Sequence, residues 1–346
     1  MKAALLEQFG EPLAVRDVPE PVPGPGQILI RVEACGLCHS DLHVARGEWE
    51  GLQPRMPMPV ILGHEAAGRV VRLGAGSARF REGDRVGVPW FFWTCGACRY
   101  CRRDQEVFCD RSEITGVTVH GGFAEYLVAW ETHALPIPDG LSLIEAAPLF
   151  CAGGTVWSAL GKVDLDASVR LGVWGAGGLG LYAVQIGKLR GAEVAAVDLH
   201  ESRLELARRF GADATVAAPA AADWFSREDR RVDVALVAAT SADAYESAFR
   251  SLRKNGVLLV VGIPSQPLSW TAGDLIRSGT RIVPSRVASR REIDELLRLA
   301  ATGKIRSEVV RFPLDRINDA IKELLEGRVA GRAVLDLAEW TNGLTQ

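Results

Sequence analysis

The 346-residue sequence contains no apolar run near the roughly 20 residues that a membrane-spanning helix needs. Its opening stretch, MKAALLEQFGEPLAV, holds one lysine and lacks both the apolar segment and the small-residue cleavage site of a secretory signal. The net charge is only −3, so there is no excess of positive charge to attract nucleic acid or anionic lipid. The sequence therefore predicts a cytoplasmic protein with no nucleic-acid partner and no membrane partner.

Methionine is also scarce, with Met1, Met56 and Met58 as the complete set. This scarcity bears on the stretch CGLCHSDLH, residues 35–43, which begins with the C-x-x-C-H pattern of covalent haem attachment. A c-type haem is attached outside the cytoplasm and often takes an axial methionine, so the haem interpretation is disfavoured. In a reducing compartment the seven cysteines are instead expected to bind metal or to act in catalysis.

The pattern of the chain changes near residue 151. Before that point, short β-type runs such as GQILIRVEA and HEAAGRVVRLG lie between glycine and proline turns, which predicts an irregular β domain. After it, apolar strand patterns alternate with helical ones, which predicts a doubly wound parallel sheet. The last two helices do not obviously extend this sheet and could return to the first domain. The expected strands are residues 168–175, 193–198, 233–239 and 257–262, and the expected helices are residues 179–191, 201–211, 243–256, 291–303 and 315–327.

A glycine-rich loop joins the first of these strands to the first helix. Its pattern, G-x-G-x-x-G, is weak alone in a chain with 36 glycines. Its position between a strand and a helix is what a dinucleotide site requires, because the glycines let the backbone approach a pyrophosphate at the helix N-terminus. The loop residues that we expect at the cofactor are Gly175, Gly177, Gly178, Leu179 and Gly180.

Asp198 ends the second strand of this half of the chain. Its carboxylate can accept hydrogen bonds from the adenosine ribose and would repel a 2′-phosphate, which favours NAD over NADP. Arg203 lies nearby in sequence, and its charge could accommodate a phosphate, although a solvated helix arginine is an equally good interpretation. The sequence predicts NAD as the cofactor.

Four cysteines form the strongest local metal motif. Cys95, Cys98, Cys101 and Cys109 are close enough in sequence for their thiolates to close a tetrahedral zinc site with no open position. Such a closed site is structural. An iron–sulfur cluster is the less favoured use of the same four residues.

A second metal site can be drawn from the remaining thiols and the histidines with polar neighbours. A catalytic zinc takes three protein ligands and keeps one open position, which two cysteines and one histidine can supply. Two thiolates and one imidazole also leave the zinc complex neutral, which suits a buried site. The candidates are Cys35, Cys38 and Cys151 with His39, His43 and His64, the last of which adjoins Glu65.

Taken together, these motifs resemble those of the zinc-dependent medium-chain alcohol dehydrogenases, most of all their microbial tetrameric branch. The resemblance covers essentially the whole chain and keeps the family's order of motifs. It is carried by CGLCHSDLH (35–43), GHE (63–65), GDRVGVPW (83–90), the four-cysteine segment, GGFAEYL (121–127), APLFCAGGTVW (147–157), GAGGLG (175–180) and GRAVLDL (331–337).

The resemblance implies which residues surround the catalytic zinc. Glu65 would lie behind the metal as an occasional ligand, and Asp41 would hydrogen-bond the zinc-bound histidine, a general way to orient a metal ligand. Cys35 would be a small buried residue, so that its C-x-x-C spacing to the next cysteine is accidental. The implied zinc ligands are Cys38, His64 and Cys151.

The resemblance also implies roles around the reacting alcohol. Zinc makes a bound alcohol more acidic, and in the family the proton leaves through a hydroxyl, the cofactor ribose and a surface imidazole, here Ser40 and then His43. The positions that contact the cofactor's pyrophosphate correspond to His39 and Arg332, either of which could instead be merely solvated. Further cofactor contacts are expected at Val261, Gly262 and Ile263.

The implied fold is α/β, with a GroES-like irregular β catalytic domain and a Rossmann coenzyme domain. The expected boundaries are residues 1–151 with 289–346 for the catalytic domain and 152–288 for the coenzyme domain. The implied activity is the oxidation of mainly primary alcohols to aldehydes with NAD. The chain would carry two zinc ions and form a homo-oligomer, either a tetramer or a dimer.

The substrate is less well defined than the reaction. Trp49 and Trp90 match positions where microbial relatives place bulky aromatics around the alcohol, although packing within the first domain would also explain them. Residues 283–290 read VPSRVASR where relatives often read VGSIVGTR, and this segment lies near the family's pocket wall. A polyol, a secondary alcohol or another hydroxylated substrate is therefore the alternative. A zinc-ribbon binding module and a metal-free quinone reductase are disfavoured by the Rossmann pattern and by the ligands present.

Overall fold

A computed structural model describes residues 1–264 and 266–338 of the chain. Its contacts divide the chain into two compact units, Met1–Gly154 with Ala288–Gln346, and Thr155–Val287. Within the described residues no single helix is long and apolar enough to cross a membrane, and the bent pair Leu143–Phe150 and Ala152–Leu160 reaches that length and composition only when the two are taken together.

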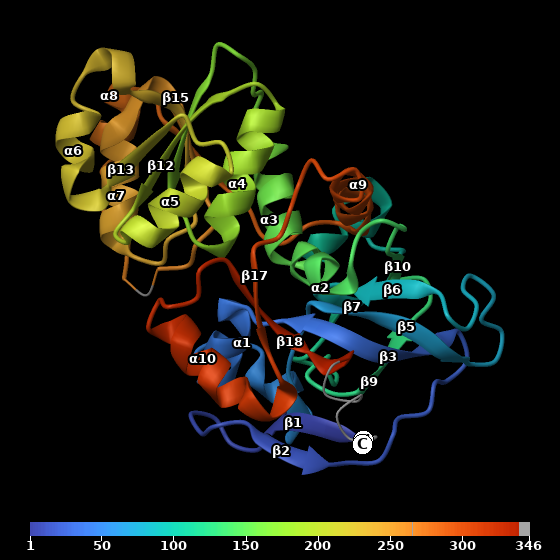
Figure 1. Ribbon diagram of the computed structural model, residues 1–346. Helices are drawn as coiled ribbons and strands as arrows, with labels where there is room; N and C mark the ends of the chain where they lie inside the picture. The colour runs from blue at the N-terminus through green and yellow to red at the C-terminus, as the bar shows by residue number, and fades with distance from the viewer. Residues whose placement is uncertain (265, 339–346) are drawn as a thin grey trace. The chain divides into compact units, whose positions relative to one another are not determined.

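The second unit contains a six-stranded parallel sheet in the order β13-β12-β11-β14-β15-β16. Helix α4 follows β11, α5 follows β12 and α7 follows β14, so strands and helices alternate as the sequence predicts (Figure 1). The expected doubly wound Rossmann fold is thereby confirmed. The strands are β11 Arg170–Trp174, β12 Glu193–Asp198, β13 Ala214–Ala217, β14 Val232–Val237, β15 Leu252–Val260 and β16 Arg281–Pro284. The helices are α4 Gly178–Leu189, α5 Glu201–Arg209, α6 Ala221–Trp224, α7 Ala242–Ser251 and α8 Ala272–Ser278.

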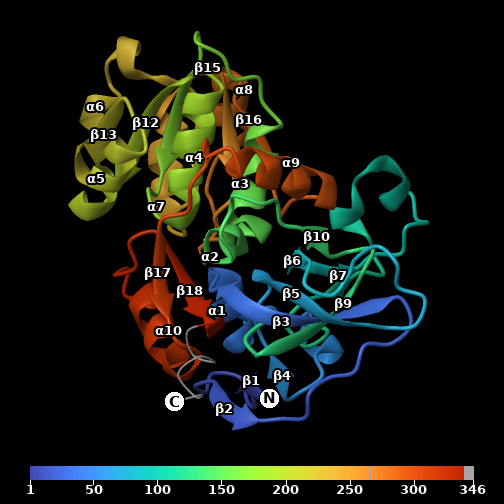
Figure 2. The same cartoon turned by 45° about the vertical axis from the view of Figure 1, so that its right-hand side comes forward.

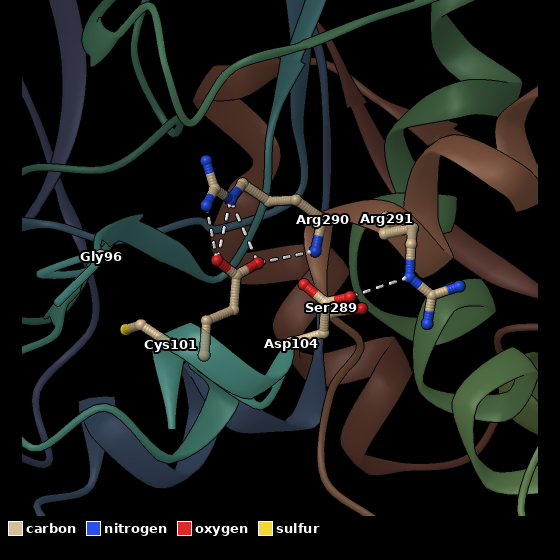
Figure 3. Close-up of a pocket in the computed structure, with 7 residues that line it drawn as sticks. Gly96, Cys101, Asp104, Ser289, Arg290 and Arg291 are labelled. Atoms are coloured by element: carbon tan, nitrogen blue, oxygen red, sulfur yellow. Dashed lines mark hydrogen bonds and ion pairs between the residues drawn. The ribbon is translucent and has the colours of Figure 1, made fainter. Parts of the chain in front are cut away.

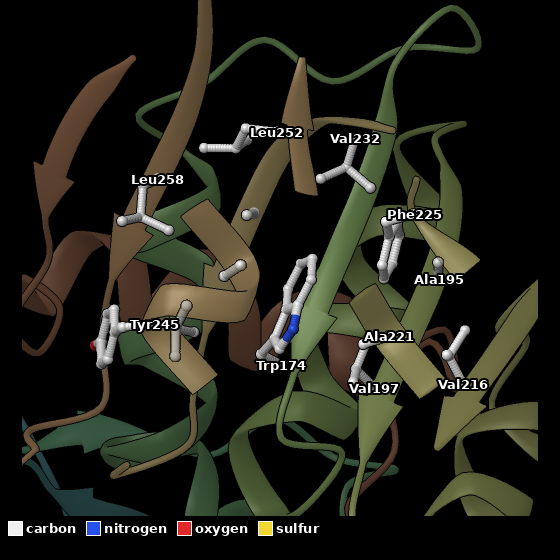
Figure 4. Packing of buried hydrophobic residues seen from close by; sticks show 13 residues of the cluster. Trp174, Ala195, Val197, Val216, Ala221, Phe225, Val232, Tyr245, Leu252 and Leu258 are labelled. Carbon is white, nitrogen blue, oxygen red and sulfur yellow. The ribbon is translucent and has the colours of Figure 1, made fainter. Parts of the chain in front are cut away.

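Strand β11 anchors the glycine loop by packing on both faces of this sheet. A Cβ at Gly187 of α4 would lie 2.7 Å from Leu171, so the helix sits directly on the face to which Leu171 points. The ring of Trp174 points to the opposite face, where it lies 5.2 Å from the ring of Phe225 and donates to Ser247 Oγ (Figure 4). The carboxyl end of β11, from which the loop emerges, is therefore held by a buried aromatic cluster.

One helix is shorter than its sequence pattern suggests. The pattern predicts a helix over residues 243–256, but α7 ends at Ser251 and β15 begins at Leu252. After Leu252 the pairing with β14 resumes only at Val257, so the residues between them bulge from the sheet. The helix ends because Leu252 is already extended, with φ −69° and ψ 144°, and Asn255 within the bulge has a left-handed φ of 62°. The prediction was wrong here because a polar and apolar pattern does not register one residue's backbone conformation.

The first unit is the irregular β domain that the sequence predicts. Its larger sheet has the order β10-β6-β5-β3-β18-β17, and β9 also pairs with β3. Strand β18 runs antiparallel to β3, so the last strand of the described chain pairs with one of the first (Figure 2). A smaller sheet has the order β2-β1-β4, and β7 pairs with β8 on either side of the four-cysteine segment.

The strands of the first unit are β1 Lys2–Leu6, β2 Ala14–Asp17, β3 Gln27–Gly36, β4 Val60–Ile61, β5 Ala66–Leu73, β6 Arg85–Val88, β7 Phe91–Trp93, β8 Glu113–Ile114, β9 Tyr126–Trp130, β10 Leu135–Pro136, β17 Val309–Phe312 and β18 Arg332–Asp336. Its helices are α1 His39–Ala45, α2 Leu143–Ala146, α9 Arg290–Ala300 and α10 Ile317–Leu325, and α3 Ala152–Leu160 begins in it. Short 3₁₀ turns include η2 Cys101–Arg103, η3 Glu106–Phe108 and η4 Ala147–Phe150.

Candidate metal centres and active site

Three separate segments of the first unit bring a set of metal-binding side chains together. Cys38 immediately precedes α1, His64 and Glu65 lie between β4 and β5, and Cys151 follows η4. Their ligand atoms all lie within 4.8 Å of one another, and all four residues are buried. Cys35 is fully buried outside this set, as is typical of a small core residue.

A single carboxylate, that of Asp41, orients two of these ligands. Its Oδ2 accepts the backbone N–H of Cys38 at 2.9 Å, which closes a capping box at the start of α1. Its Oδ1 lies 2.9 Å from Nδ1 of His64 and also accepts the N–H of Gly63. Because the carboxylate is an acceptor, Nδ1 of His64 carries the proton and Nε2 keeps its lone pair.

The set fits a zinc ion. Nε2 of His64 is buried and has no hydrogen-bond partner within residues 1–264 and 266–338, which is costly for a polar atom unless a ligand satisfies it. Two sulfurs and this nitrogen are the donor types that a catalytic zinc takes while keeping one position open. The side chains that would hold the metal are therefore Cys38, His64 and Cys151, with Glu65 close behind them.

Electrostatic coupling is strong inside this set. The hydrogen bond from Cys151 is the main cause that holds the pKa of the Cys38 thiol well below its ordinary value. The same contact and burial raise the pKa of Cys151. Burial raises the pKa of Glu65 to about 7, even though the positive charge of Arg332 opposes the rise. One thiolate is thus favoured even before a metal is considered.

Arg332 lies where sequence reasoning did not place it. Its Nη2 donates to Oε1 and Oε2 of Glu65 at 2.6 and 2.9 Å and to the carbonyl of Leu37, and the residue is only 4% exposed. Gly36 makes room for this pair, because a Cβ there would lie 1.8 Å from Oε2 of Glu65. The pyrophosphate contact of Arg332 stays a prediction, whereas the observed partner is the carboxylate behind the metal ligands. A pairing between β18 and a loop 267 residues away has no local sequence signal.

Aromatic rings connect the metal ligands to α1. The ring of Trp90 meets His64 edge-on, with centroids 4.7 Å apart, and is 6% exposed. Trp49 lies 5.9 Å from Trp90 and stacks on the ring of His43 at 5.5 Å. Trp90 therefore borders the candidate metal site directly, and Trp49 is connected to it through Trp90.

The polar residues expected near the alcohol lie along α1. His39 is its first residue and is exposed, whereas Ser40 and His43 are partly buried. Ser40 and His43 are three positions apart, so their side chains share one face of the helix. Nδ1 of His43 contacts a carboxylate oxygen of Glu48, a partner that the sequence patterns did not indicate.

The four cysteines between β7 and β8 form the second metal-binding set. Their sulfurs lie within 4.8 Å of one another. Backbone N–H groups point at three of them: Cys98 N at Cys95 Sγ (3.3 Å), Cys101 N at Cys98 Sγ (3.5 Å) and Cys95 N at Cys109 Sγ (3.5 Å). Hydrogen bonds from the backbone of Ala97 and from Arg111 lower the pKa of Cys95 to about 5. Burial and the neighbouring cysteines raise the pKa of Cys101 to about 12, so a bound cation would be needed to hold all four sulfurs as thiolates. Four converging sulfurs with no other donor fit a structural zinc.

An ion pair connects residues 95–109, the four-cysteine lobe, to the start of α9. Arg290 donates from Nε and Nη2 to both carboxylate oxygens of Glu106, and its backbone N–H reaches Oε1 at 2.9 Å (Figure 3). Thr94, the residue before the first cysteine of the lobe, donates its N–H to Nε2 of His133 at 2.9 Å. Burial, with the nearby charge of Arg290, lowers the pKa of His133 to about 4. The imidazole is thus an acceptor in the folded state.

A polar pocket of about 300 Å³ opens beside this network. Figure 3 shows Arg290 reaching Glu106 while Arg291 reaches Asp104 on another side. The charged side chains that line the pocket therefore pair with one another. The pocket is lined by Gly96, Cys101, Asp104, Glu106, Ser289, Arg290 and Arg291.

The glycine loop of the second unit has the geometry of a phosphate cradle. Gly175 has a φ of 92°, and a Cβ at Gly180 would lie 1.9 Å from the carbonyl oxygen of Gly175, so neither position accepts another residue without strain. Gly177, the residue before α4, is open on the side where a Cβ would stand, apart from Arg203 at 3.9 Å. Gly178 and Leu179 begin α4, so their N–H groups belong to its N-terminus.

Asp198 binds the loop as well as standing at the end of β12. Its Oδ2 accepts the N–H of Ala176 at 2.7 Å, its Oδ1 accepts that of His200, and Arg203 lies 3.8 Å away. The charge of Arg203 is therefore directed at Asp198. Leu199, the next residue, is 74% exposed. It offers an apolar surface beside the expected ribose and is a candidate cofactor contact that was not predicted. Its position directly after Asp198 at the end of β12 could have indicated it.

The residues expected on the nicotinamide side follow β15 in the same unit. A Cβ at Gly262 would lie 2.2 Å from the carbonyl oxygen of Ala239, and its own carbonyl accepts the hydroxyl of Tyr245 at 2.5 Å. Val261 is partly buried and Ile263 is 55% exposed. They lie at the carboxyl edge of the sheet, where ligands of doubly wound folds bind.

Comparison with known proteins finds matches along both units. Residues 24–139 match the alcohol dehydrogenase GroES-like domain, and residues 178–302 match the zinc-binding dehydrogenase domain. An alcohol dehydrogenase of Geobacillus stearothermophilus is 41% identical over 337 residues, which is 97% of this chain and 99% of that protein.

Two solved structures share the fold over nearly the whole chain. The alcohol dehydrogenase of the archaeon Aeropyrum pernix has a TM-score of 0.92 at 34% identity, covering 97% of this chain and 100% of that one. The acetophenone reductase of Geotrichum candidum, solved in complex with NAD, has a TM-score of 0.87 at 30% identity, covering 98% and 97%.

The two cysteine sets should hold one zinc ion each, and their loss should have different consequences. Cys98→Ala should release one zinc and lower the thermal unfolding temperature, since a closed metal site contributes to folding. Cys38→Ala should also release one zinc but should abolish nearly all turnover with little change in unfolding temperature. Elemental analysis, calorimetry and activity measurements on the two variants check this. A wild-type protein with one zinc and full activity would contradict the assignment.

His133 should make the protein less stable in mild acid. The pKa of an imidazole in the unfolded chain is about 6.5, whereas in the fold that of His133 is about 4. Protonation thus favours the unfolded state. The contribution of neutral His133 to the free energy of unfolding is therefore complete above about pH 6.5 and is lost as the pH falls toward 4. That contribution is at most about 3 kcal/mol. In urea unfolding, His133→Gln should be less stable than wild type at pH 7.5, and the difference should shrink at pH 4.5. Parallel pH curves would disprove the role of His133.

Proposed function

The chain belongs to the zinc-dependent medium-chain alcohol dehydrogenases, and on that premise we propose that it oxidises small primary alcohols to aldehydes at a zinc held by Cys38, His64 and Cys151. As a member of the family it is an NAD-dependent oxidoreductase that acts on alcohols. The observation that carries the proposal is the buried, unpartnered Nε2 of His64 facing two sulfurs within 4.8 Å.

The metal site divides its tasks among several side chains. When bound there, zinc supplies a Lewis acid that makes an alcohol hydroxyl easier to deprotonate. Asp41 fixes the tautomer of His64, so the imidazole presents its lone pair. Trp90 covers the edge of that imidazole and keeps water from one side of it. Arg332 balances the charge of Glu65, which leaves the carboxylate behind the ligands neutralised.

The proton of the alcohol needs a route to solvent. We assign its first acceptor to the hydroxyl of Ser40 and its last to the imidazole of His43, which share one face of α1. The hydroxyl passes on a proton as it receives one, so it stays neutral. The imidazole, which is partly exposed, can release its proton to water.

The cofactor site is assigned to the second unit. NAD supplies the hydride acceptor. The open side of Gly177 and the N-terminus of α4 suit a pyrophosphate, and Asp198 suits the ribose hydroxyls. The preference for NAD is supported by Arg203, because its charge is directed at Asp198. His39 and Arg332 remain the proposed pyrophosphate contacts from the first unit.

A preference for small primary alcohols is supported by the two tryptophans. Trp90 stands edge-to-face beside the proposed zinc ligand His64, and Trp49 stands edge-to-face against Trp90, so the two rings would limit the space next to that ligand. A hydrophobic wall discriminates by about 1–3 kcal/mol per misplaced methylene. Secondary alcohols are the second candidate class, since the related enzyme of Geotrichum candidum is named an acetophenone reductase.

We also propose that the chain works as a cytoplasmic homo-oligomer with two zinc ions per chain. Six cysteines assigned as metal ligands would need a reducing compartment to stay thiols. Strand β16 is the edge of its six-stranded sheet, and an exposed edge is commonly covered by another chain. A second copy of this chain is the partner that we propose for it.

The substrate assignment predicts that enlarging the pocket changes the ranking of alcohols. Trp90→Ala should raise kcat/KM for branched and aromatic alcohols relative to ethanol by about tenfold or more, because one wall of the site is removed. A panel of alcohols of increasing size, followed by NADH absorbance, checks this. Trp93→Ala, which alters a tryptophan of β7 that is not assigned to the pocket, is the control. If Trp90→Ala leaves the ranking unchanged, the tryptophan is a core residue and not a wall of the site.

The cofactor assignment predicts that the charge of Asp198 excludes NADP. Asp198→Asn keeps an acceptor for the N–H of Ala176 but removes the charge, so kcat/KM with NADP relative to NAD should rise about 10- to 100-fold, the range of a charge-assisted hydrogen bond. Asp198→Gly should show the same direction and should also weaken the loop. Steady-state kinetics with both cofactors measure the ratio. Equal use of NAD and NADP by the wild type would show that Arg203 outweighs Asp198.

The oligomer assignment predicts a particle heavier than the 37.4 kDa chain. Sedimentation equilibrium over a range of concentrations should give two or four times that mass, because pairing at β16 would join copies in twos. A mass of one chain at micromolar concentration would rule the proposed oligomer out.

A further inference from the structure

A tight turn after α1 folds the chain back onto His43. The helix ends at Ala45, and Gly47 takes a φ of 71°, a left-handed conformation that reverses the chain. The backbone N–H of Glu48 then donates to the carbonyl oxygen of His43 at 3.0 Å. Gln53 holds the turn through a 2.7 Å hydrogen bond to the carbonyl of Gly47.

This turn places two side chains against the imidazole of His43. A carboxylate oxygen of Glu48 contacts Nδ1. The ring of Trp49 stacks on the imidazole at a centroid distance of 5.5 Å and an angle of 21°. The ring is thus held by its own helix, by a carboxylate at one nitrogen and by an indole on one face. Within residues 1–264 and 266–338, Nε2 of His43 has no hydrogen bond to another residue.

We propose that Glu48 is a positioning residue for proton transfer, which keeps the proton of neutral His43 on Nδ1 so that Nε2 is the atom that accepts the proton from the alcohol. The inference rests on the proposed function, which ends the proton route at His43. An ionised carboxylate can only accept a hydrogen bond, so Nδ1 must donate to it. Neutral imidazole has one proton, and Nε2 therefore keeps its lone pair.

The carboxylate acts again once His43 has taken up the proton. The proton arrives at Nε2, the ring becomes an imidazolium, and its positive charge is balanced by Glu48 in contact with Nδ1. Water then takes the proton from Nε2, and both residues return to their starting states. A carboxylate that fixes a tautomer and balances the charge formed on it is an established way to support a histidine base.

The charges around His43 are few. Nη1 of Arg46 lies 3.7 Å from Oε1 of Glu48, the carboxylate oxygen that does not contact His43. Asp41, on the same helix, is engaged with His64 and Cys38. Trp49, which packs on the ring, is uncharged. The hydrogen bond from His43, with the charge of Arg46, lowers the pKa of Glu48, so the carboxylate is ionised across the neutral range.

The rival interpretation is that Glu48 merely forms a surface ion pair that stabilises the turn. Its side chain is 42% exposed, as such pairs often are, and they contribute little. The two interpretations differ in one respect. A surface pair stabilises the turn and leaves both neutral tautomers of His43 accessible, whereas a positioning carboxylate holds the neutral ring in the tautomer protonated on Nδ1.

The test compares four variants of the zinc-loaded, full-length enzyme. Glu48→Gln removes the charge at His43, Glu48→Asp restores a carboxylate, and His43→Gln removes the base. Glu50→Gln removes an exposed carboxylate two positions further on and serves as the matched control. kcat/KM for ethanol oxidation is measured from pH 5.5 to 9.5 at saturating NAD.

The kinetic expectation is specific to each variant. Glu48→Gln should lower kcat/KM by about tenfold across the measured range, because Nε2 is no longer held as the nitrogen that accepts the proton. Glu48→Asp should recover most of the wild-type profile, and Glu50→Gln should match the wild type throughout. If His43→Gln changes the profile but Glu48→Gln does not, the positioning role is disproved. If His43→Gln leaves the profile unchanged, the proposed proton route itself is wrong.

A spectroscopic measurement separates the two outcomes without using turnover. Two-bond ¹H–¹⁵N correlation spectra of protein labelled at the imidazole nitrogens, recorded at alkaline pH where the ring is neutral, show which nitrogen carries the proton. In the wild type and in Glu50→Gln, His43 should carry it on Nδ1, whereas Glu48→Gln should also populate the tautomer protonated on Nε2. The same tautomer in Glu48→Gln and Glu50→Gln would overturn the inference.

Discussion

The hydrogen bonds of the Asp41 carboxylate are the interactions on which the proposed catalytic site depends. A buried carboxylate must be fully hydrogen-bonded, and this one is satisfied by the N–H of Cys38, the N–H of Gly63 and the imidazole of His64. It therefore starts α1, fixes the loop before β5 and sets the tautomer of a metal ligand at once. Because α1 begins there, its next turn also fixes the direction of His43 and the start of the turn that brings Glu48 back to it. Geometry at the metal and geometry at the proposed proton acceptor thus have one common origin.

The two metal-binding sets differ in how far their ligands lie apart in sequence, and this decides what the sequence could reveal. The four cysteines are close neighbours, so their spacing alone identifies a closed site, and the backbone N–H groups that stabilise them come from the same segment. Cys38, His64 and Cys151 come from three distant segments, and spacing left Cys35 as good a candidate as Cys38. Only the resemblance to a family separated these two residues. The structure gives the physical reason, since Cys35 lies on β3 with its side chain in the core and Cys38 stands at a helix start.

The fold was predictable where the periodicity of side chains decided it and unpredictable where a single backbone conformation did. The alternating strands and helices of the second unit follow from their apolar patterns, and the sheet order agrees with a doubly wound fold. The end of α7 does not follow, because Asn255 and Gly256 form a bulge inside what reads as a helix. The pair of Arg332 with Glu65 is also beyond sequence patterns, since it depends on which strand lies beside β3. Glu48 could have been noticed from its position just after a helix end, but nothing in its residue type distinguishes it from a solvated acid.

The position of β18 shows that the proposed catalytic set depends on a strand from the far end of the chain, in contrast to the four-cysteine lobe. Strand β18 pairs with β3 in the register that places Leu335 opposite Cys35, and this pairing brings Arg332 to Glu65. Without that guanidinium, a carboxylate would be buried beside two thiols with no compensating charge, which is strongly unfavourable. The residues behind the metal are therefore acceptable only after a strand from the far end of the chain has joined the sheet. The four-cysteine lobe needs no distant strand, because its four candidate ligands lie within residues 95–109. Its ion pair with α9, between Glu106 and Arg290, involves none of these cysteines. Closure of the larger sheet is thus the step that makes the charge arrangement of the catalytic site stable.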